Sequence, residues 1–251
     1  MSIELRIINP LNYPNWDNIL LSNQQCNFFH SSIWAKVLNE VYKYQPVYFA
    51  QLNKDKLLTL FPVMEVKTFL TGRRGVSLPF SDYCEPIIDE HFQFQDSVNF
   101  ILQYGQKIGW NYFELRGGDK FNQDILPYQH FFLHTLSLNQ NIEQIFSNLR
   151  KSTQRNINKA NREGVKINDE QSLDAIKEFY KLNCITRKHH GLPPQPYNFF
   201  KAIFNQIISK NNGFIILASY KKRIIAGAIF FHFVDEDTEA LGKICCGISS
   251  C

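Results

Sequence analysis

Two pairs of apolar runs, each pair separated by a two-residue polar turn, constrain the fold of this chain more than any other feature. Residues 45–53 and 57–69 flank the turn Lys54-Asp55, and a similar pair within residues 214–234 flanks Lys221-Lys222. Apolar runs of this length around a short polar turn are typical of β-hairpins. The sequence therefore predicts two hairpins that lie far apart in the chain.

Amphipathic patterns of helical period alternate with these strand-like runs. Because helical segments precede a hairpin in each half, we expect a mixed α/β fold of two units, residues 1–139 and 140–251, with a duplicated architecture. Asn141 and Ser172 stand where helix N-caps are expected, and Gly109 and Gly164 where helices end. The predicted helices cover residues 31–43, 92–108, 141–164, 172–190 and 196–208, and further strands cover 75–80, 112–115, 130–138 and 165–168.

Composition excludes several classes of protein. The 27 Lys and Arg against 23 Asp and Glu give a formal net charge of +4, too mild for a dedicated nucleic-acid coat protein. We expect no DNA partner. No apolar run approaches the roughly 20 residues that cross a bilayer, and the first ten residues lack the pattern of a secretory signal. The six cysteines include no C-x-x-C pair, so we expect a cytoplasmic protein without a transmembrane segment or a metal site.

The strongest local charge lies in residues 148–166, which hold six Lys or Arg and a single acid, Glu163. Lys151, Arg155, Lys159 and Arg162 are spaced four, four and three residues apart, so a helix places them on one face. Like charges at these spacings repel unless an anion lies near them. The pattern predicts a site for a phosphate-rich ligand, and an ordinary solvated helix face is the alternative.

The helix expected over residues 172–190 changes character along one face. Its apolar line leads to Asn183, Arg187 and His190. Such a change marks either a pocket wall or a helix end that emerges into water, and cations near a helix C-terminus also interact favourably with the helix dipole. Both interpretations remain open for Arg187 and His190.

In the first unit, residues 77–83 leave a strand and enter a loop that contains Pro79 and Asp82. Such a loop can present Asp82 to a ligand, although Asp is also a common turn residue. Gly72-Arg73-Arg74-Gly75 lacks the glycine spacing of a phosphate-binding loop, and we interpret it as a turn.

Four segments resemble the Fem-type aminoacyltransferases and their GNAT-like acyltransferase relatives. They are residues 147–165 (SNLRKSTQRNINKANREGV), 186–196 (TRKHHGLPPQP), 78–84 (LPFSDYC) and 114–117 (ELRG). The resemblance implies two GNAT-like domains with a substrate channel between them. It also implies transfer of an acyl or aminoacyl group to an amine, often on a peptidoglycan precursor of the cell wall.

The resemblance and the charge pattern together suggest roles for particular residues. The donor would be acyl-CoA or aminoacyl-tRNA as a co-substrate, with no tightly bound cofactor, and the acceptor a small or lipid-linked amine. A catalytically inactive remnant that keeps anion or RNA binding is the alternative. The expected catalytic residues are Asp82 and His190, and the expected substrate-binding residues are Lys151, Arg155, Lys159, Arg187 and Arg116.

The last residues depart from the family pattern. Residues 235–251 (DEDTEALGKICCGISSC) lack the hydrophobic period of a strand or a long helix. We therefore expect an incomplete second domain, with strands missing at its C-terminal side, and weak or no transfer activity.

Overall fold

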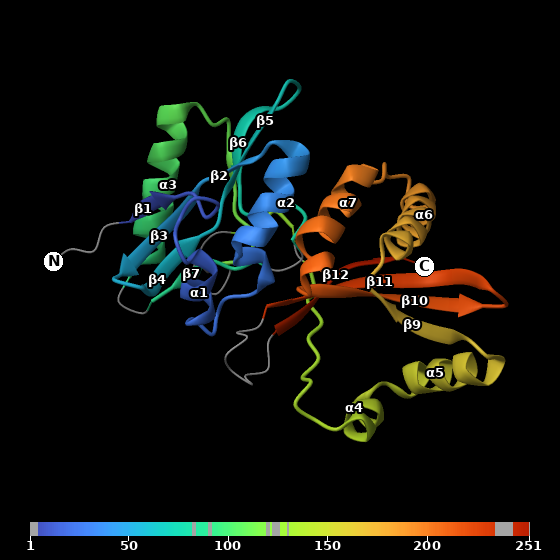
Figure 1. The fold of residues 1–251 in the computed structure, drawn as a ribbon. Coiled ribbons are helices and arrows are strands. Elements are labelled where there is room, and N and C mark those ends of the chain that lie inside the picture. Colours follow the sequence, from blue (N-terminus) through green and yellow to red (C-terminus); the bar gives the residue numbers. More distant parts are fainter. Residues whose placement is uncertain are drawn as a thin grey trace. The chain divides into compact units, whose positions relative to one another are not determined.

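A computed structural model describes residues 5–81, 84–89, 92–118, 121, 126–129, 131–233 and 243–250. The chain divides into two compact units: unit 1 holds Met1–His130 with Phe233–Cys245, and unit 2 holds Phe131–His232 with Cys246–Cys251. Helices accompany β-sheets in both units (Figure 1), which confirms the mixed α/β class.

Unit 1 contains two four-stranded sheets, with strand orders β1-β3-β4-β7 and β2-β5-β6-β8. Its strands pair antiparallel, except that β8 runs parallel to β6. Its elements are β1 (Arg6–Ile8), α1 (Trp16–Leu21), η1 (Phe28–His30), α2 (Ser32–Tyr42), β2 (Gln45–Pro46), β3 (Tyr48–Asn53), β4 (Lys56–Phe61), β5 (Met64–Thr68), β6 (Gly72–Val76), β7 (Ile87–Ile88), α3 (Phe94–Ile108) and β8 (Phe113–Glu114).

The first predicted hairpin is confirmed, because β3 and β4 pair around Lys54 and Asp55. Each of its strands breaks, however, and continues into the second sheet as β2 and β5, where Pro46 opposes Met64. Pro62 lies at the break between β4 and β5. Proline has no N–H for a strand ladder, so the predicted single strand over 57–69 cannot run straight through this position.

Helices cover both faces of the first sheet (Figure 1). On one face, Phe49 of β3 packs against Tyr104 of α3, with ring centroids 5.3 Å apart. On the other face, the neighbouring Tyr48 meets Trp16 of α1 at 5.9 Å. Since successive residues of a strand point to opposite faces, a strand covered on both sides is apolar throughout, and β3 is buried from Tyr48 to Gln51.

Trp110 joins α3 to the second sheet. A Cβ atom at Gly105 of α3 would lie 2.5 Å from the Trp110 ring, and one at Gly75 of β6 would lie 2.3 Å from it. The indole N–H donates to Oε2 of Glu65 at 3.1 Å, and Nη2 of Arg73 lies 2.9 Å from Oε1 of the same carboxylate. This corner fixes the start of β8 beside β6.

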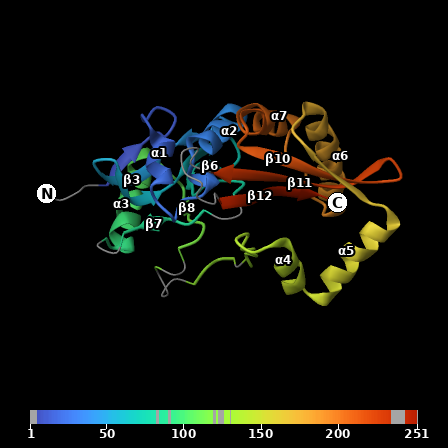
Figure 2. The same ribbon diagram turned by 60° about the horizontal axis from the view of Figure 1, so that its bottom comes forward.

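Unit 2 has one sheet of order β12-β11-β10-β9. Its strands lie between the helix pair α6 and α7 and the helix pair α4 and α5 in both views (Figures 1 and 2). Its elements are α4 (Ile142–Asn148), α5 (Lys151–Glu163), β9 (Lys166–Glu170), α6 (Leu173–His189), α7 (Tyr197–Gln206), η2 (Ile208–Lys210), β10 (Gly213–Tyr220), β11 (Arg223–Phe233) and β12 (Lys243–Ser250).

The core of unit 2 lies between its sheet and the α6–α7 pair. Phe179 of α6 packs against Phe200 of α7, with ring centroids 5.8 Å apart. A Cβ atom at Gly227 of β11 would come within 2.9 Å of the Phe179 ring, so this glycine lets the helix lie close to the sheet. The second predicted hairpin is confirmed here, because β10 and β11 pair around Lys221 and Lys222.

The predicted N-caps are also confirmed. Asn141 accepts a hydrogen bond from the Gln144 N–H at 2.8 Å, and Ser172 accepts one from the Ala175 N–H at 3.1 Å. The prediction of one helix from 141 to 164 is wrong, because Leu149 is extended, with φ −66° and ψ 151°. The Gln154 amide donates to the carbonyls of Leu149 at 2.8 Å and Ser147 at 3.1 Å, which satisfies groups that a continuous helix would have paired.

Two strand predictions near the ends of unit 2 are wrong. The strand expected over 130–138 is absent from residues 131–138, and His130 lies outside the described residues. The terminal segment, expected to form no strand, contributes β12, which extends the sheet beside β11. Pairing along the β11 edge supplies the backbone hydrogen bonds that this segment's weak hydrophobic period does not predict.

We predict that Gly105→Ala destabilises the protein. Alanine favours a helix interior over glycine by about 1 kcal/mol, but its Cβ would overlap the Trp110 ring, and overpacking costs about 1–3 kcal/mol. Urea unfolding would show a lower free energy of unfolding. Gln103→Ala, on the exposed side of α3, is the control and changes it by less than about 0.5 kcal/mol. A more stable Gly105→Ala protein would contradict the packing of this corner.

Candidate functional site

A pocket of about 210 Å³ lies on unit 1, where β6 and β8 meet the loop after β6. It combines two arginines, three aromatic rings and one carboxylate, which is a composition suited to a planar or anionic ligand. Its lining residues are Tyr44, Val66, Arg74, Val76, Pro79, Phe80, Tyr112, Glu114 and Arg116.

Strand alternation places Arg74 in this pocket. Gly72–Val76 forms β6, so the interpretation of residues 72–75 as a turn is wrong. Successive side chains of a strand point to opposite faces. Arg73 pairs with Glu65, and Arg74 turns the other way, with its guanidinium 5.8 Å from the Tyr112 ring centroid. The sequence analysis missed Arg74 because it did not assign these residues to a strand.

The loop after β6 is held in an unusual backbone conformation. Leu78 and Phe80 have φ values of 43° and 60°, in the left-handed region that costs a non-glycine residue about 1–3 kcal/mol. Leu78 is fully buried, and the Ser81 hydroxyl donates to its carbonyl at 2.7 Å. Burial and hydrogen bonding therefore fix the loop in a form that presents Phe80 at the pocket.

Arg116, predicted as a substrate-binding residue, lies in this pocket. Its Nε donates to Oε1 of Glu114 at 2.9 Å, and its Nη1 points to the carbonyls of Leu78 at 3.4 Å and Ser81 at 3.5 Å. Arg116 therefore holds the loop that leads to Asp82. Asp82, predicted as catalytic, lies outside the described residues.

The two segments of unit 1 that resemble the Fem-type enzymes contact each other. A Cβ atom at Gly117, which has φ +75°, would lie 2.7 Å from Cγ of Glu85 and 3.3 Å from its Cα. Beyond the described gap at 82–83, the Glu85 carbonyl lies 3.0 Å from Nε2 of the buried His30. Arg116 and His30 thus hold the chain on both sides of Asp82.

A stack of aromatic rings forms one wall of the pocket. Tyr42 lies between Tyr44 and Phe80, at centroid distances of 5.3 and 5.0 Å with nearly parallel rings. Burial, with a smaller effect of Tyr44, raises the pKa of Tyr42 to about 12. Burial also raises the pKa of Tyr44, and Arg74 opposes that shift. These shifts place Tyr44 and Arg74 close to each other in a poorly hydrated wall.

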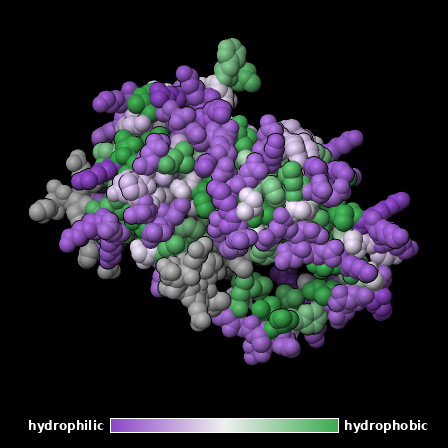
Figure 3. Space-filling view, viewed as in Figure 1, coloured by the Kyte–Doolittle hydropathy of each residue, from purple (hydrophilic) through white to green (hydrophobic). Residues whose placement is uncertain are grey.

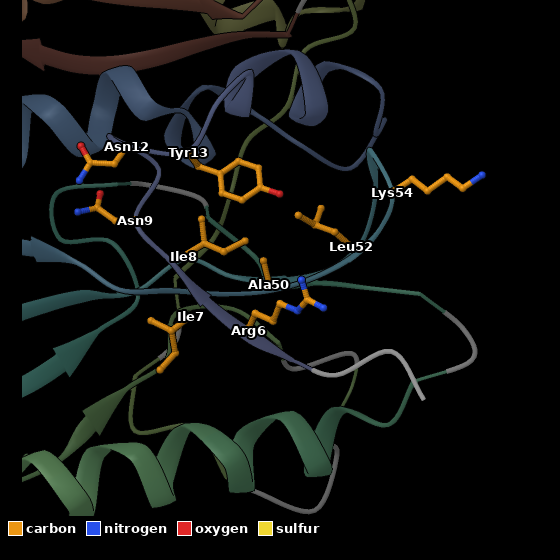
Figure 4. A pocket seen from close by; sticks show the side chains of 9 residues that line it. All are labelled: Arg6, Ile7, Ile8, Asn9, Asn12, Tyr13, Ala50, Leu52 and Lys54. Carbon is orange, nitrogen blue, oxygen red and sulfur yellow. The ribbon is translucent and has the colours of Figure 1, made fainter. Parts of the chain in front are cut away.

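A larger hollow of about 480 Å³ lies at the outer edge of β1 in the same unit. Ile8, Ala50 and Leu52 line its middle, Arg6 and Lys54 extend toward one end, and Asn9 and Asn12 lie toward the other (Figure 4). It contains none of the residues that the sequence singles out. The smaller pocket is therefore the candidate site of unit 1.

In unit 2, the basic residues Lys151, Arg155 and Lys159 lie on α5, and all three are exposed. The Lys159 ammonium is 3.8 Å from the Glu163 carboxylate in an exposed pair, which contributes little to stability. No side chain of α5 is buried. The cations of this helix are therefore accessible to a ligand.

The end of α6 has a structural explanation. Nε of Arg187 donates to the Pro193 carbonyl at 3.2 Å, and the buried Asn183 contacts Gln195 at 3.4 Å. Both polar groups hold the turn that leads into α7. His190, predicted as catalytic, is the exposed C-cap residue of α6.

The expectation that Arg155, Lys159 and Arg187 share one cleft is not met. The strands of unit 2 lie between α5, which carries the first two, and α6, which carries Arg187 (Figures 1 and 2). Helical spacing correctly groups residues within α5, but it does not determine on which side of a sheet another helix packs.

Within the described residues, no group of three or more His, Cys, Asp or Glu side chains is placed to hold a metal ion. In the same part of the chain, no helix combines the length and apolar character needed to cross a bilayer.

We predict that Arg116→Gln loosens the loop over residues 77–81 without unfolding the protein. The side chain is partly exposed, so its pair with Glu114 contributes about 1 kcal/mol or less to global stability. Hydrogen exchange at these amides should rise several-fold while the unfolding midpoint stays almost unchanged. Unchanged exchange would show that Arg116 does not hold the loop.

The buried phenol of Tyr42 predicts a loss of stability at high pH. Its pKa rises from 10 to about 12 on folding, so its stabilising effect is complete below pH 10 and is lost as the pH rises to about 12. Tyr42→Phe should therefore unfold with a weaker pH dependence over that range. Urea unfolding at pH 8 and pH 11 measures this, and identical pH dependence in both proteins would contradict it.

Comparison with known proteins identifies the family. Residues 106–223 match the FemAB family. Among solved structures, the chain is similar to FemX, known from a crystal structure, with a TM-score of 0.52 and 13% sequence identity. The match covers 86% of this chain and 57% of FemX, so the chain spans little more than half of that protein, and the likeness shows a shared fold. No curated protein matches the chain by sequence.

The segment matching the family runs from the end of α3 to the start of β11. It includes Arg116 of the pocket and the whole of the basic helix α5. On this evidence, the chain is a member of the FemAB family over residues 106–223.

Proposed function

We propose that this chain transfers an aminoacyl group from aminoacyl-tRNA to an amine of a cell-wall peptide precursor. The observation that carries the proposal is the FemAB match, because the matched residues supply both Arg116 of the pocket and the basic face of α5. These are two different surfaces, each with the chemistry of one substrate.

The pocket of unit 1 is proposed to bind the acceptor. Arg74 and Arg116 offer guanidinium groups to a carboxylate or phosphate. Tyr44, Phe80 and Tyr112 offer ring faces to a planar group. The pocket opens beside the loop that leads to Asp82, so an acceptor held there approaches the predicted catalytic residue.

The basic face of α5 is proposed to bind the donor. Lys151, Arg155 and Lys159 are exposed and repeat at intervals of one helical turn. Phosphate contacts by such residues supply sequence-independent affinity for RNA. An acyl-CoA donor also carries phosphates, and the assay below separates the two donors.

The reaction needs no covalent enzyme intermediate. The neutral amine of the acceptor attacks the ester carbonyl carbon of the donor, a C–N bond forms, and the C–O bond to the ribose breaks. The amine loses a proton and the leaving ribose oxygen gains one. Asp82 and His190 remain the proposed residues for this proton movement, and orientation of the two substrates provides much of the rate.

A catalytically inactive remnant that binds RNA through α5 is the second candidate. The observation that favours it is that the chain spans 57% of FemX. Both candidates bind phosphates, so binding alone does not separate them, whereas turnover does.

The test is a transfer assay that follows formation of the new amide by mass spectrometry. Aminoacyl-tRNA and acyl-CoA are compared as donors, with soluble and lipid-linked cell-wall peptides as acceptors. We expect an amide product with aminoacyl-tRNA. Absence of any product with every donor, combined with salt-sensitive tRNA binding, would establish the inactive remnant.

Substitutions should separate the two surfaces. Arg74→Gln should raise the KM for the acceptor about tenfold, because one charge-assisted hydrogen bond is lost. Arg155→Gln/Lys159→Gln should instead raise the KM for tRNA and reduce its salt dependence by about one log unit per contact. Lys177→Gln/Lys181→Gln on α6, where both lysines are exposed and paired with acids, is the matched control and should change neither KM.

A further inference from the structure

Large apolar side chains are exposed along residues 131–149 of unit 2, here called the apolar segment. Phe131 and Phe132 are 86% and 96% exposed, and Ile142 is 81% exposed. Leu133, Leu136 and Leu138 are also exposed. Scattered exposed apolar residues are normal, but a contiguous run of this kind marks a surface that another phase or molecule covers.

The apolar segment has the features of a surface that binds a partner. Residues 131–138 adopt no strand, and no side chain of α4 is buried. Glu143 is its single Asp, Glu, Lys or Arg residue. Figure 3 shows apolar side chains gathered over the position of α4, with hydrophilic side chains beside them.

The basic helix α5 follows directly in the chain and lies on the same side of the sheet as α4 (Figures 1 and 2). Arg150 begins the basic run, and Lys151, Arg155, Lys159 and Arg162 continue it. Unit 2 therefore presents an uncharged apolar stretch and a cationic helix next to each other. Each is exposed along its whole length.

We propose that the apolar segment and α5 together form a docking face for an anionic membrane surface. Leucine, isoleucine and phenylalanine side chains enter the boundary between headgroups and acyl chains, and the adjacent lysines and arginines contact the anionic headgroups. This face lies on the bilayer and does not span it. The docking goes beyond the proposed transfer reaction and does not depend on it.

Charge and composition favour a membrane over the other occupants. RNA would use the cations of α5 and could stack on aromatic rings, but it gains little from Leu133, Leu136 and Ile142. A second copy of this face would bring two cationic helices together, which like-charge repulsion opposes. An anionic bilayer satisfies the apolar and the cationic parts at once.

The test is flotation of the intact chain with vesicles of phosphatidylcholine alone and with vesicles in which about a third of the lipid is phosphatidylglycerol. We expect at least about tenfold stronger binding to the anionic vesicles, weakened by salt. Phe131→Ser/Phe132→Ser should reduce this binding about tenfold or more. Arg155→Gln/Lys159→Gln should reduce it several-fold, and circular dichroism verifies that each variant is folded.

Phe69→Ser/Leu70→Ser is the matched control, because these residues of unit 1 are equally exposed apolar side chains. It should leave vesicle binding unchanged. Three results would overturn the proposal: equal binding to both kinds of vesicle or to neither, equal loss in the control, or a dimer that dissociates on Phe131→Ser/Phe132→Ser. Binding of tRNA that needs Arg155 and Lys159, without any effect of the phenylalanines on vesicles, would assign the face to RNA.

Discussion

The packing of Trp110 between two glycines fixes the arrangement of unit 1. The indole occupies the space that a Cβ atom would need at Gly75 of β6 and at Gly105 of α3, and its N–H reaches the Glu65 carboxylate, which also pairs with Arg73. Three residues after Trp110 the chain enters β8, parallel to β6. The positions of Glu114 and Arg116 at the pocket follow from this contact.

The same contact determines which arginine serves the pocket. Because Glu65 holds Arg73 on one face of β6, strand alternation sends Arg74 to the other face, beside Tyr44 and Tyr112. A packed corner and a polar pocket thus occupy opposite faces of one short strand. The α4–α5 side of unit 2 differs from this arrangement, since no residue of either helix is buried. We interpret that contrast as a division between a rigid acceptor site and an open surface for larger partners.

Local signals predicted much of the fold. The hairpin turns, the Asn141 and Ser172 caps and the C-terminal glycine of α3 depend on residues near one another in the chain, and the structure confirms them. The misses depend on distant partners. The Gln154 amide interrupts a helix that periodicity alone would continue. The run over 131–138 has strand composition but finds no pairing strand in the described residues.

The site was harder to predict than the fold for the same reason. Arg116 was found through a short family motif, whereas Arg74 was missed because its orientation depends on Glu65, which lies in another strand. The grouping of Arg187 with Arg155 failed because helical spacing carries no information about the side of a sheet on which each helix lies. Asp82 remains a prediction.

The central claim is that acceptor and donor bind on two separate surfaces. Hydrogen exchange of the intact chain, measured once with the cell-wall peptide precursor and once with uncharged tRNA, tests it most directly. The account predicts that the peptide protects residues 74–81 and 112–116, and that tRNA protects residues 151–163. Protection of one common region by both ligands, or of neither region by its expected ligand, would contradict the account.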